Sequence, residues 1–355
     1  MKSKKIIASV LSALILLSGC SAKTDITTET TGAGTESTAG TIKFDDETTQ
    51  SETTAEKSKF EFNPHVYSAQ LGKSISQDKW DAFYNLCDAL RAGETTFECA
   101  SEEAYKWAMD DTVLCCLFPA AGLKIDTKME DGSKAFENGT GKIHYKMDIQ
   151  EYVKRQADFE TLILDMINST VEKDDTDYEK ALKLYLYIAE HFEYEHEIEE
   201  VDNYVYKTFT RNKGQCINYA AVYAYLLLQV GVDALAVGTY EGLCHAWTYV
   251  IINGKGYHID TTWALKSEYP ELDSVYIDYF MMSDEERNSD NCKVFGLTVD
   301  LLPCYWAKYQ DVPYKAEDNH YNFRSFCKFV KLDEENKILH YVDMENTPHE
   351  FHYDI

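Results

Sequence analysis

The sequence predicts an α+β fold, in which helices and an antiparallel sheet come from separate stretches of the chain. Residues 232–238 and 245–252 have the pattern of buried strands, and Asn253-Gly254 after them is a strong hairpin signal that returns residues 257–263 antiparallel. A helix is indicated just before these strands, because apolar residues recur there at helical spacing until Gly231: Ala220, Ala221, Ala224, Leu227 and Leu228.

The folded part of the chain divides into three predicted regions. Residues 60–148 mix helical and strand patterns and are interpreted as an N-terminal α/β region. Residues 149–310 form the predicted core, which opens with two amphipathic helices at 149–171 and from Asp177, a candidate helix cap. Residues 311–355 form a C-terminal β extension with a hairpin at 333–336, and we expect it to complete a sheet at the edge of the core. The stretch 276–282 predicts one more strand.

Cys216 lies in the first turn of the helix that begins near residue 216. Unpaired backbone N–H groups and the positive end of the helix dipole favour an anion there, which lowers the pKa of a thiol. Gly214 would allow a sharp backbone turn just before it. These features predict a nucleophilic cysteine.

A histidine and a carboxylate follow on the two strands of the predicted hairpin. If Asn253 and Gly254 form a two-residue turn, Trp247 lies opposite Asp260, and His245 is the diagonal neighbour of Asp260 on the same face. A bulge or a wider loop could bring the pair directly opposite each other. Taken singly, such residues are commonly a buried cysteine, a satisfied core histidine and a turn aspartate. Together they supply a nucleophile, a base and a group that orients the base.

The blocks Gly214-Gln215-Cys216, His245-Ala246-Trp247 and 260–263 (Asp-Thr-Thr-Trp) resemble the three motif blocks of the transglutaminase-like superfamily. The resemblance implies a papain-like core, in which the helix carrying the cysteine packs on an antiparallel sheet carrying the histidine and the aspartate. It also implies the roles: Cys216 as nucleophile, His245 as general base and acid, and Asp260 as the orienting carboxylate. The superfamily includes crosslinking enzymes, peptidases, amidases and inactive binding modules, so membership does not name the reaction.

Three further residues are candidates for the oxyanion hole or the cleft. The backbone N–H of Cys216 is one expected oxyanion donor, and Gln215 is a candidate for the second. Trp247 and Trp263 could line a cleft, although strand aromatics also pack in cores.

The start of the chain predicts export. Residues 1–20 have a basic segment, an apolar segment and small residues before Cys20, which resembles a bacterial lipoprotein signal with Cys20 as the lipidated residue. Residues 21–59 are rich in Thr, Glu, Ser and Gly and predict a disordered tether. We therefore expect a protein that is anchored to the bacterial cell membrane by lipid and faces outward.

Composition limits the partners. The formal net charge is −27, from 61 acidic and 34 basic residues, which argues against nucleic acid and weakly favours cationic substrates. The acidic stretch 193–202 contains His196 and could bind a cation or a basic substrate, or could simply be a solvated loop. His191 and His196 lack the spacing of a zinc site, and we expect no metal and no cofactor.

The predicted activity is hydrolysis of an amide bond in a peptide, a protein or a cell-wall peptide, through an acyl-enzyme on Cys216. If an amine rather than water resolves the acyl-enzyme, the protein is a crosslinking transglutaminase. A hypothesis of another class is a binding module without catalysis, which keeps the three residues as structure.

Overall fold

The computed structural model describes residues 58–197, 205–239, 245–287, 314–323 and 326–353. The predicted signal with Cys20, and the predicted tether up to residue 57, lie outside this part of the chain. The described residues form one compact unit. Within them, no helix combines the length and the apolar character needed to cross a membrane.

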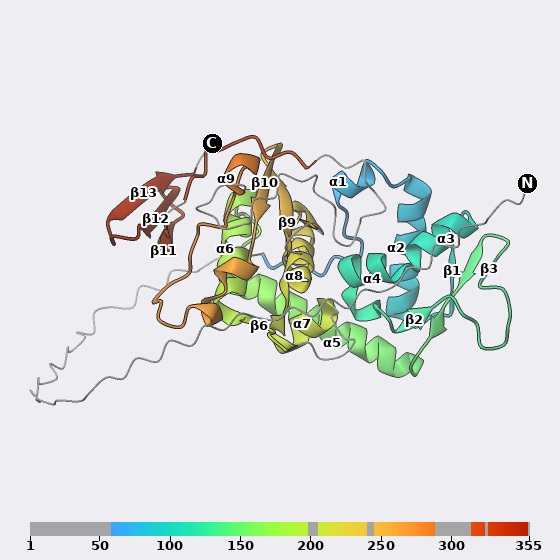
Figure 1. The fold of residues 1–355 in the computed structure, drawn as a ribbon. Coiled ribbons are helices and arrows are strands. Elements are labelled where there is room, and N and C mark those ends of the chain that lie inside the picture. The colour runs from blue at the N-terminus through green and yellow to red at the C-terminus, as the bar shows by residue number, and fades with distance from the viewer. Residues whose placement is uncertain (1–57, 198–204, 240–244, 288–313, 324–325, 354–355) are drawn as a thin grey trace, which may run out of the picture. The chain divides into compact units, whose positions relative to one another are not determined.

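The centre of the fold is helix α8 (Cys216–Gln229), which packs on a three-stranded antiparallel sheet (Figure 1). The sheet has the order β10-β9-β8, from β8 (Asp233–Thr239), β9 (His245–Ile252) and β10 (Lys255–Ile259). Nearly the whole of α8 is buried, so its stripe of Ala and Leu is one part of a helix that is apolar on most sides. The predicted α+β fold is confirmed, with the cysteine-bearing helix on the antiparallel sheet.

The hairpin between β9 and β10 has the predicted register. Asn253 and Gly254 both have positive φ, at 52° and 76°, and Ile252 pairs with Lys255. The ladder ends at Ile259, because the next N–H, that of Asp260, donates instead to the carbonyl of Tyr279 at 2.9 Å. Asp260 is therefore placed just beyond the sheet.

The strand predicted at 276–282 is wrong. Only two isolated bridges form there, His258 with Met282 and Tyr276 with Lys328. The backbone turns between them, since the N–H of Phe280 donates to the carbonyl of Ile277 and Met281 has a positive φ of 55°.

Three more helices lie near α8. Two of them contact α8 directly, α6 (Asp177–His191) and α7 (Val205–Arg211), and α5 (Ile149–Thr170) contacts α6. The hydroxyl of Tyr223 on α8 donates to the carbonyl of Ala181 on α6 at 2.8 Å. The cap of α6 is Thr176, not Asp177, because Thr176 forms a capping box with Glu179.

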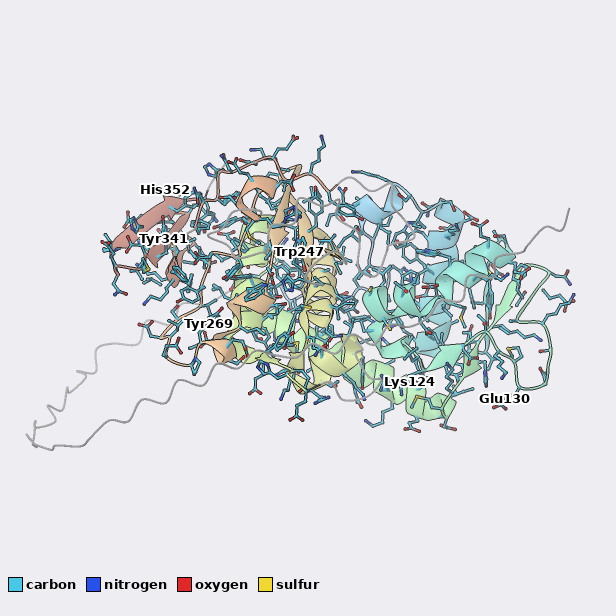
Figure 2. All side chains as sticks on the ribbon, in the orientation of Figure 1. Lys124, Glu130, Trp247, Tyr269, Tyr341 and His352 are labelled. Atoms are coloured by element: carbon cyan, nitrogen blue, oxygen red, sulfur yellow. The ribbon has the colours of Figure 1, made fainter. Side chains whose placement is uncertain are left out.

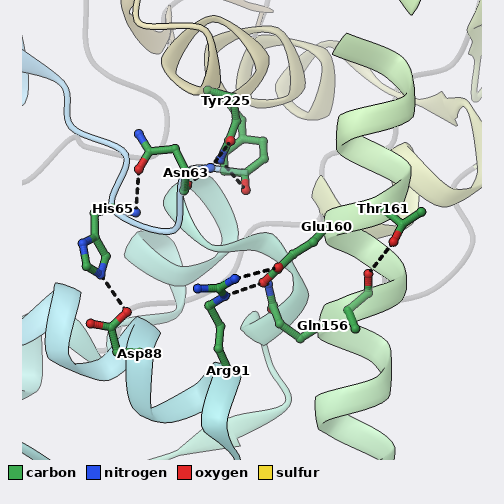
Figure 3. Close-up of polar contacts among 10 residues, drawn as sticks. Asn63, His65, Asp88, Arg91, Gln156, Glu160, Thr161 and Tyr225 are labelled. Carbon is green, nitrogen blue, oxygen red and sulfur yellow. Dashed lines mark hydrogen bonds and ion pairs between the residues drawn. The ribbon is translucent and has the colours of Figure 1, made fainter. Parts of the chain in front are cut away.

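The N-terminal region is the predicted mixture of helices and short strands, which are α1 (Ala69–Gly72), α2 (Gln77–Ala92), β1 (Thr96–Glu98), α3 (Glu102–Ala108), α4 (Asp111–Leu117), a 3-10 helix (Pro119–Ala121), β2 (Ile125–Asp126), β3 (Phe136–Glu137), β4 (Thr140–Lys142) and β5 (His144–Tyr145). Polar contacts join it to the core. Arg91 of α2 makes two hydrogen bonds, of 2.7 and 3.0 Å, to Glu160 of α5 (Figure 3). The hydroxyl of Ser68 donates to Asp233 at the start of β8.

The C-terminal residues form a separate antiparallel sheet of β11 (Lys328–Asp333), β12 (Ile338–Val342) and β13 (Pro348–His352). The hairpin at 333–336 is confirmed, and its strands form a sheet of their own rather than adding to the sheet of β8 to β10. Polar and aromatic contacts join it to the core: Lys337 and Tyr353 each bond the buried carboxylate of Glu179 at 2.7 Å, and the ring of Tyr353 stacks on Tyr178 with centroids 4.7 Å apart. Burial raises the pKa of Glu179, but these bonds and those of Thr176 lower it to about 2.

Candidate active site

Cys216 is the first residue of α8, and it is partly exposed. Gln215 is the N-cap, and its backbone N–H donates to Oδ1 of Asn218 in the first turn at 3.0 Å. The remaining N–H groups of this turn point toward the thiol end of the helix, where they favour a negative charge.

Gly214 is required for space rather than for a turn. It lies in the short strand β7 (Lys213–Gly214), which pairs in parallel with β6 (Glu193–Tyr194). A Cβ at Gly214 would lie 2.7 Å from Oγ1 of Thr208 and 3.2 Å from Cβ of Asn218. Gly214 is not among the glycines with positive φ, so the predicted sharp turn is wrong. A glycine is needed here because α7 packs closely against the start of α8 and leaves no room for a side chain.

His245 and Asp260 meet as the hairpin register predicted. Nε2 of His245 is 2.6 Å from Oδ2 of Asp260, and the two side chains are 8% and 1% exposed. The other carboxylate oxygen of Asp260 accepts the backbone N–H groups of Thr262 at 3.0 Å and Trp263 at 3.3 Å. Asp260 is thus a buried carboxylate with three donors.

The imidazole of His245 also hydrogen-bonds the thiol of Cys216. Because Nε2 faces Asp260, Nδ1 is the nitrogen left for Cys216. Burial lowers the pKa of His245, but the charge and hydrogen bond of Asp260, with a smaller contribution from Cys216, raise it to about 10. The imidazole is therefore protonated at neutral pH, and a protonated imidazole beside a thiol stabilises the thiolate.

Trp263 lies at the edge of this pair and lines the cavity beside it. Its Nε1 is 2.8 Å from Nε2 of His245, and the two rings meet edge to face with centroids 5.7 Å apart. The indole sits against the His245–Asp260 hydrogen bond and helps to leave the imidazole only 8% exposed. Trp263 is a cleft residue, as the sequence analysis allowed.

Trp247 lies behind His245 and is not one of the residues that line the cavity. It is 2% exposed, and its ring stacks on His245 with centroids 5.9 Å apart and an angle of 28°. Of the two interpretations, core packing therefore describes Trp247 (Figure 2). Gln215 directs Nε2 at the carbonyl of Glu195 at 3.1 Å, so one of its two amide hydrogens is engaged.

His258 supports Trp247, and the sequence analysis gave it no role. Nδ1 of His258 accepts the indole N–H of Trp247 at 3.0 Å, and Nε2 is 2.9 Å from Oδ1 of Asp284. The ring is fully buried and the guanidinium of Arg287 lies over Trp247, 5.2 Å from its centroid. Burial first, together with the charge of Arg287, lowers the pKa of His258 to about 4 despite Asp284. The sequence held one signal for a role of His258: it is two residues from Asp260 in the predicted strand, so the two side chains were expected on the same face.

A cavity of about 350 Å³ opens beside His245. It is lined by Tyr194, His196, His245, Thr262, Trp263, Glu268 and Tyr269. Tyr194 comes from β6, His196 from the loop after it, His245 from the start of β9, and the other four from the chain after β10, where Figure 2 labels Tyr269. The described residues contain no group of three or more His, Cys, Asp or Glu arranged to hold a metal ion.

Comparison with known proteins agrees with the motif blocks. The family model described as the transglutaminase-like superfamily matches residues 165–261, which include Cys216, His245 and Asp260. The resemblance seen in the sequence is therefore confirmed for this stretch. No curated protein matches the chain.

Two solved structures match part of the chain. One is described as a TGase, with 23% identity over 31% of this chain and 32% of its own, at a TM-score of 0.27. The other is described as a candidate cysteine protease from Cytophaga hutchinsonii, with 19% identity over 30% of this chain and 37% of its own, at a TM-score of 0.25. The chain thus spans about a third of the length of each.

The buried neutral His258 makes the stability of the protein sensitive to mild acid. Its pKa of about 4 in the folded protein lies below the ordinary histidine pKa of about 6.5, so between these pH values the unfolded state binds more protons. The contribution of His258 to stability is complete above pH 6.5 and is lost as the pH falls toward 4. We expect His258→Asn to reduce the slope of unfolding free energy against pH in this window by up to about 1.4 kcal/mol per pH unit.

Urea unfolding at several pH values between 4 and 7 measures this slope. The slope is the informative quantity, because the substitution also changes stability at neutral pH. An unchanged slope in His258→Asn would show that His258 is not held neutral. His349, which is 40% exposed and bonds Asp343, offers a control position: His349→Asn should leave the slope in place.

Proposed function

We propose that the transglutaminase-like core of this chain is a thiol enzyme that cleaves amide bonds of peptides or proteins through an acyl-enzyme on Cys216. The single observation that carries this proposal is the contact of His245 with both the Cys216 thiol and the buried Asp260 carboxylate. The proton carrier His245 is thus in hydrogen-bond reach of both the nucleophile and the orienting group, as the chemistry requires.

In the proposed reaction, the Cys216 thiolate attacks the amide carbonyl and forms a carbon–sulfur bond. The carbonyl oxygen becomes negative and is bound by the backbone N–H of Cys216, with the second amide hydrogen of Gln215 as a candidate donor. The protonated His245 then gives its Nδ1 proton to the leaving amine as the carbon–nitrogen bond breaks. The acyl group stays on sulfur.

The second half of the reaction returns the enzyme to its starting state. Water attacks the thioester while neutral His245 takes one of its protons, and the carbon–sulfur bond breaks to give a carboxylic acid and the thiolate. Asp260 keeps the ring oriented and stabilises its charged form throughout. We propose water as the acceptor, because it needs no dedicated binding site. A primary amine in its place would make the protein a crosslinker.

The pH dependence of Cys216 alkylation tests the nucleophile. In the full-length protein, limiting iodoacetamide with peptide mapping should show Cys216 reacting at pH values well below the usual thiol pKa of about 8.5. His245→Ala removes the positive partner, so we expect its reaction to move up to the pH range of an ordinary thiol. Asp260→Asn should lie between the two.

Cys216→Ser is the control that assigns the label to the right peptide. If wild-type Cys216 is inert, or titrates like an ordinary thiol, the proposed enzyme is refuted and a binding module on the same fold takes its place. Ligand binding that persists in Cys216→Ala, with no turnover by the wild type, would be the corresponding positive result for that alternative.

Isotope labelling identifies the acceptor. When wall fragments and a peptide library are incubated with the enzyme in H₂¹⁸O, hydrolysis should place one ¹⁸O atom in each new carboxyl group, as measured by mass spectrometry. Adding a labelled primary amine should leave this result unchanged. Amine incorporation without new carboxyl groups would instead identify a crosslinking transglutaminase.

We also propose, from the sequence of residues 1–59, that the enzyme acts outside the cell on a lipid anchor at Cys20. This location fits peptides or wall peptides as substrates, and the net charge of −27 argues against nucleic acid as a partner. Cys20→Ser should move the protein out of the membrane fraction, and a protein that stays there would refute the anchor.

A further inference from the structure

We infer that the cavity beside His245 binds a positively charged group of the substrate, an ammonium or a guanidinium, with Glu268 as its counter-ion. This inference rests on the proposed function, because it assigns a substrate class to the same site. It concerns the part of the substrate next to the amide that Cys216 attacks.

The cavity has one carboxylate among aromatic walls. Glu268 ends the 3-10 helix Lys266–Glu268, and its side chain is 32% exposed where it lines the cavity. Tyr194, Trp263 and Tyr269 are the aromatic residues that line the cavity with it. A carboxylate with several aromatic rings is a combination that suits a cation, since ring faces and the carboxylate both attract positive charge.

The pKa values of Tyr194 and Tyr269 indicate which charges lie around the cavity. Burial first, and then the negative charges of Cys216, Glu268 and Asp260, raise the pKa of Tyr194 to about 12. The pKa of Tyr269 is also raised by burial and then by Tyr276, Glu268, Asp260 and Glu271. The groups that shift these two pKa values are therefore anionic, while the protonated His245 is a cation at the Cys216 end of the cavity.

Nearby cations are held by other carboxylates. Lys266 lies 2.6 Å from Glu190, while Arg211 and Lys213 contact Glu195 at 3.1 and 3.6 Å. No lysine or arginine is among the described residues that line the cavity. A cation from the substrate would therefore meet no lysine or arginine in the described lining, and the positive charge of His245 is neutralised by Asp260 at 2.6 Å.

Glu268 has capacity for another partner. His196 reaches it with Nε2 at 3.1 Å from Oε1, and His196 is itself 68% exposed. The second oxygen of Glu268 has no partner among the described residues. An anionic substrate group would face the negative charge of Glu268, and a purely apolar one would desolvate Glu268 without pairing it. A cationic group avoids both costs.

Charged thiol reagents test the inference without a known substrate. Cys216 in the full-length protein is treated with cationic 2-aminoethyl methanethiosulfonate, neutral methyl methanethiosulfonate and anionic 2-sulfonatoethyl methanethiosulfonate, and the rates are read by peptide mapping. We expect the cationic reagent to be favoured over the neutral one. In Glu268→Gln, the ratio of cationic to neutral rates should fall about fivefold, the effect of one partly exposed charge pair.

Glu345→Gln is the matched control. It removes one exposed negative charge that forms no ion pair with the described residues, and Glu345 does not line the cavity. The ratio should stay at the wild-type value in this variant, which separates the local effect of Glu268 from the overall charge of −27. Thermal melting checks that both variants fold.

The outcomes separate this inference from the proposed function. If the neutral reagent modifies Cys216 no faster than an ordinary thiol, the proposed function fails. If the neutral reagent reacts fast but the ratio is the same in wild type, Glu268→Gln and Glu345→Gln, the nucleophile stands and the cation site is refuted. An equal fall of the ratio in both variants also refutes it, because the effect is then one of net charge.

Discussion

The hydrogen bond between His245 and the buried carboxylate of Asp260 is the interaction on which the site depends. A carboxylate that is 1% exposed needs hydrogen-bond donors in place of water. Here the imidazole occupies one oxygen, and the backbone N–H groups of Thr262 and Trp263 occupy the other. These N–H groups are available because the chain leaves the sheet after Ile259 and turns back toward Asp260. The end of the ladder therefore also provides the donors that stabilise the Asp260 carboxylate.

Two histidines on adjacent strands show how environment decides charge. His245 contacts the buried carboxylate of Asp260 and the thiol of Cys216, and its pKa rises to about 10. His258 has Asp284 as a partner, but burial and Arg287 lower its pKa to about 4. Trp247 lies between them, stacked on the first and bonded to the second. A neutral, buried histidine thus supports the ring behind the charged one.

Much of the core could be predicted from sequence because its signals are strong and local. The Asn253-Gly254 turn set the hairpin register, and the helical spacing after Cys216 placed α8. From these two elements followed the meeting of His245 with Asp260. The motif blocks and the register therefore pointed to the same three residues independently.

Other features depend on contacts between distant segments or on very short elements. The parallel pairing of β6 with β7 involves two residues in each strand, which is too short for a period. Thr176 was missed as a cap because Asp177, its neighbour, is an equally good cap residue by type. The cavity was missed because Tyr194 and Glu268 are far apart in sequence and only the fold brings them to His245. The acidic stretch with His196 gave a partial signal.

The cavity residues lie on pieces of chain that the sheet does not hold. Glu268 and Tyr269 follow β10 by several residues, and His196 lies beyond the short strand β6, whereas His245 belongs to the ladder itself. Substitutions in these loops leave the ladder and the helix that position the reacting atoms in place. The fold therefore allows the substrate preference of the cavity to be redesigned, or to diverge in evolution, while Cys216, His245 and Asp260 keep their positions.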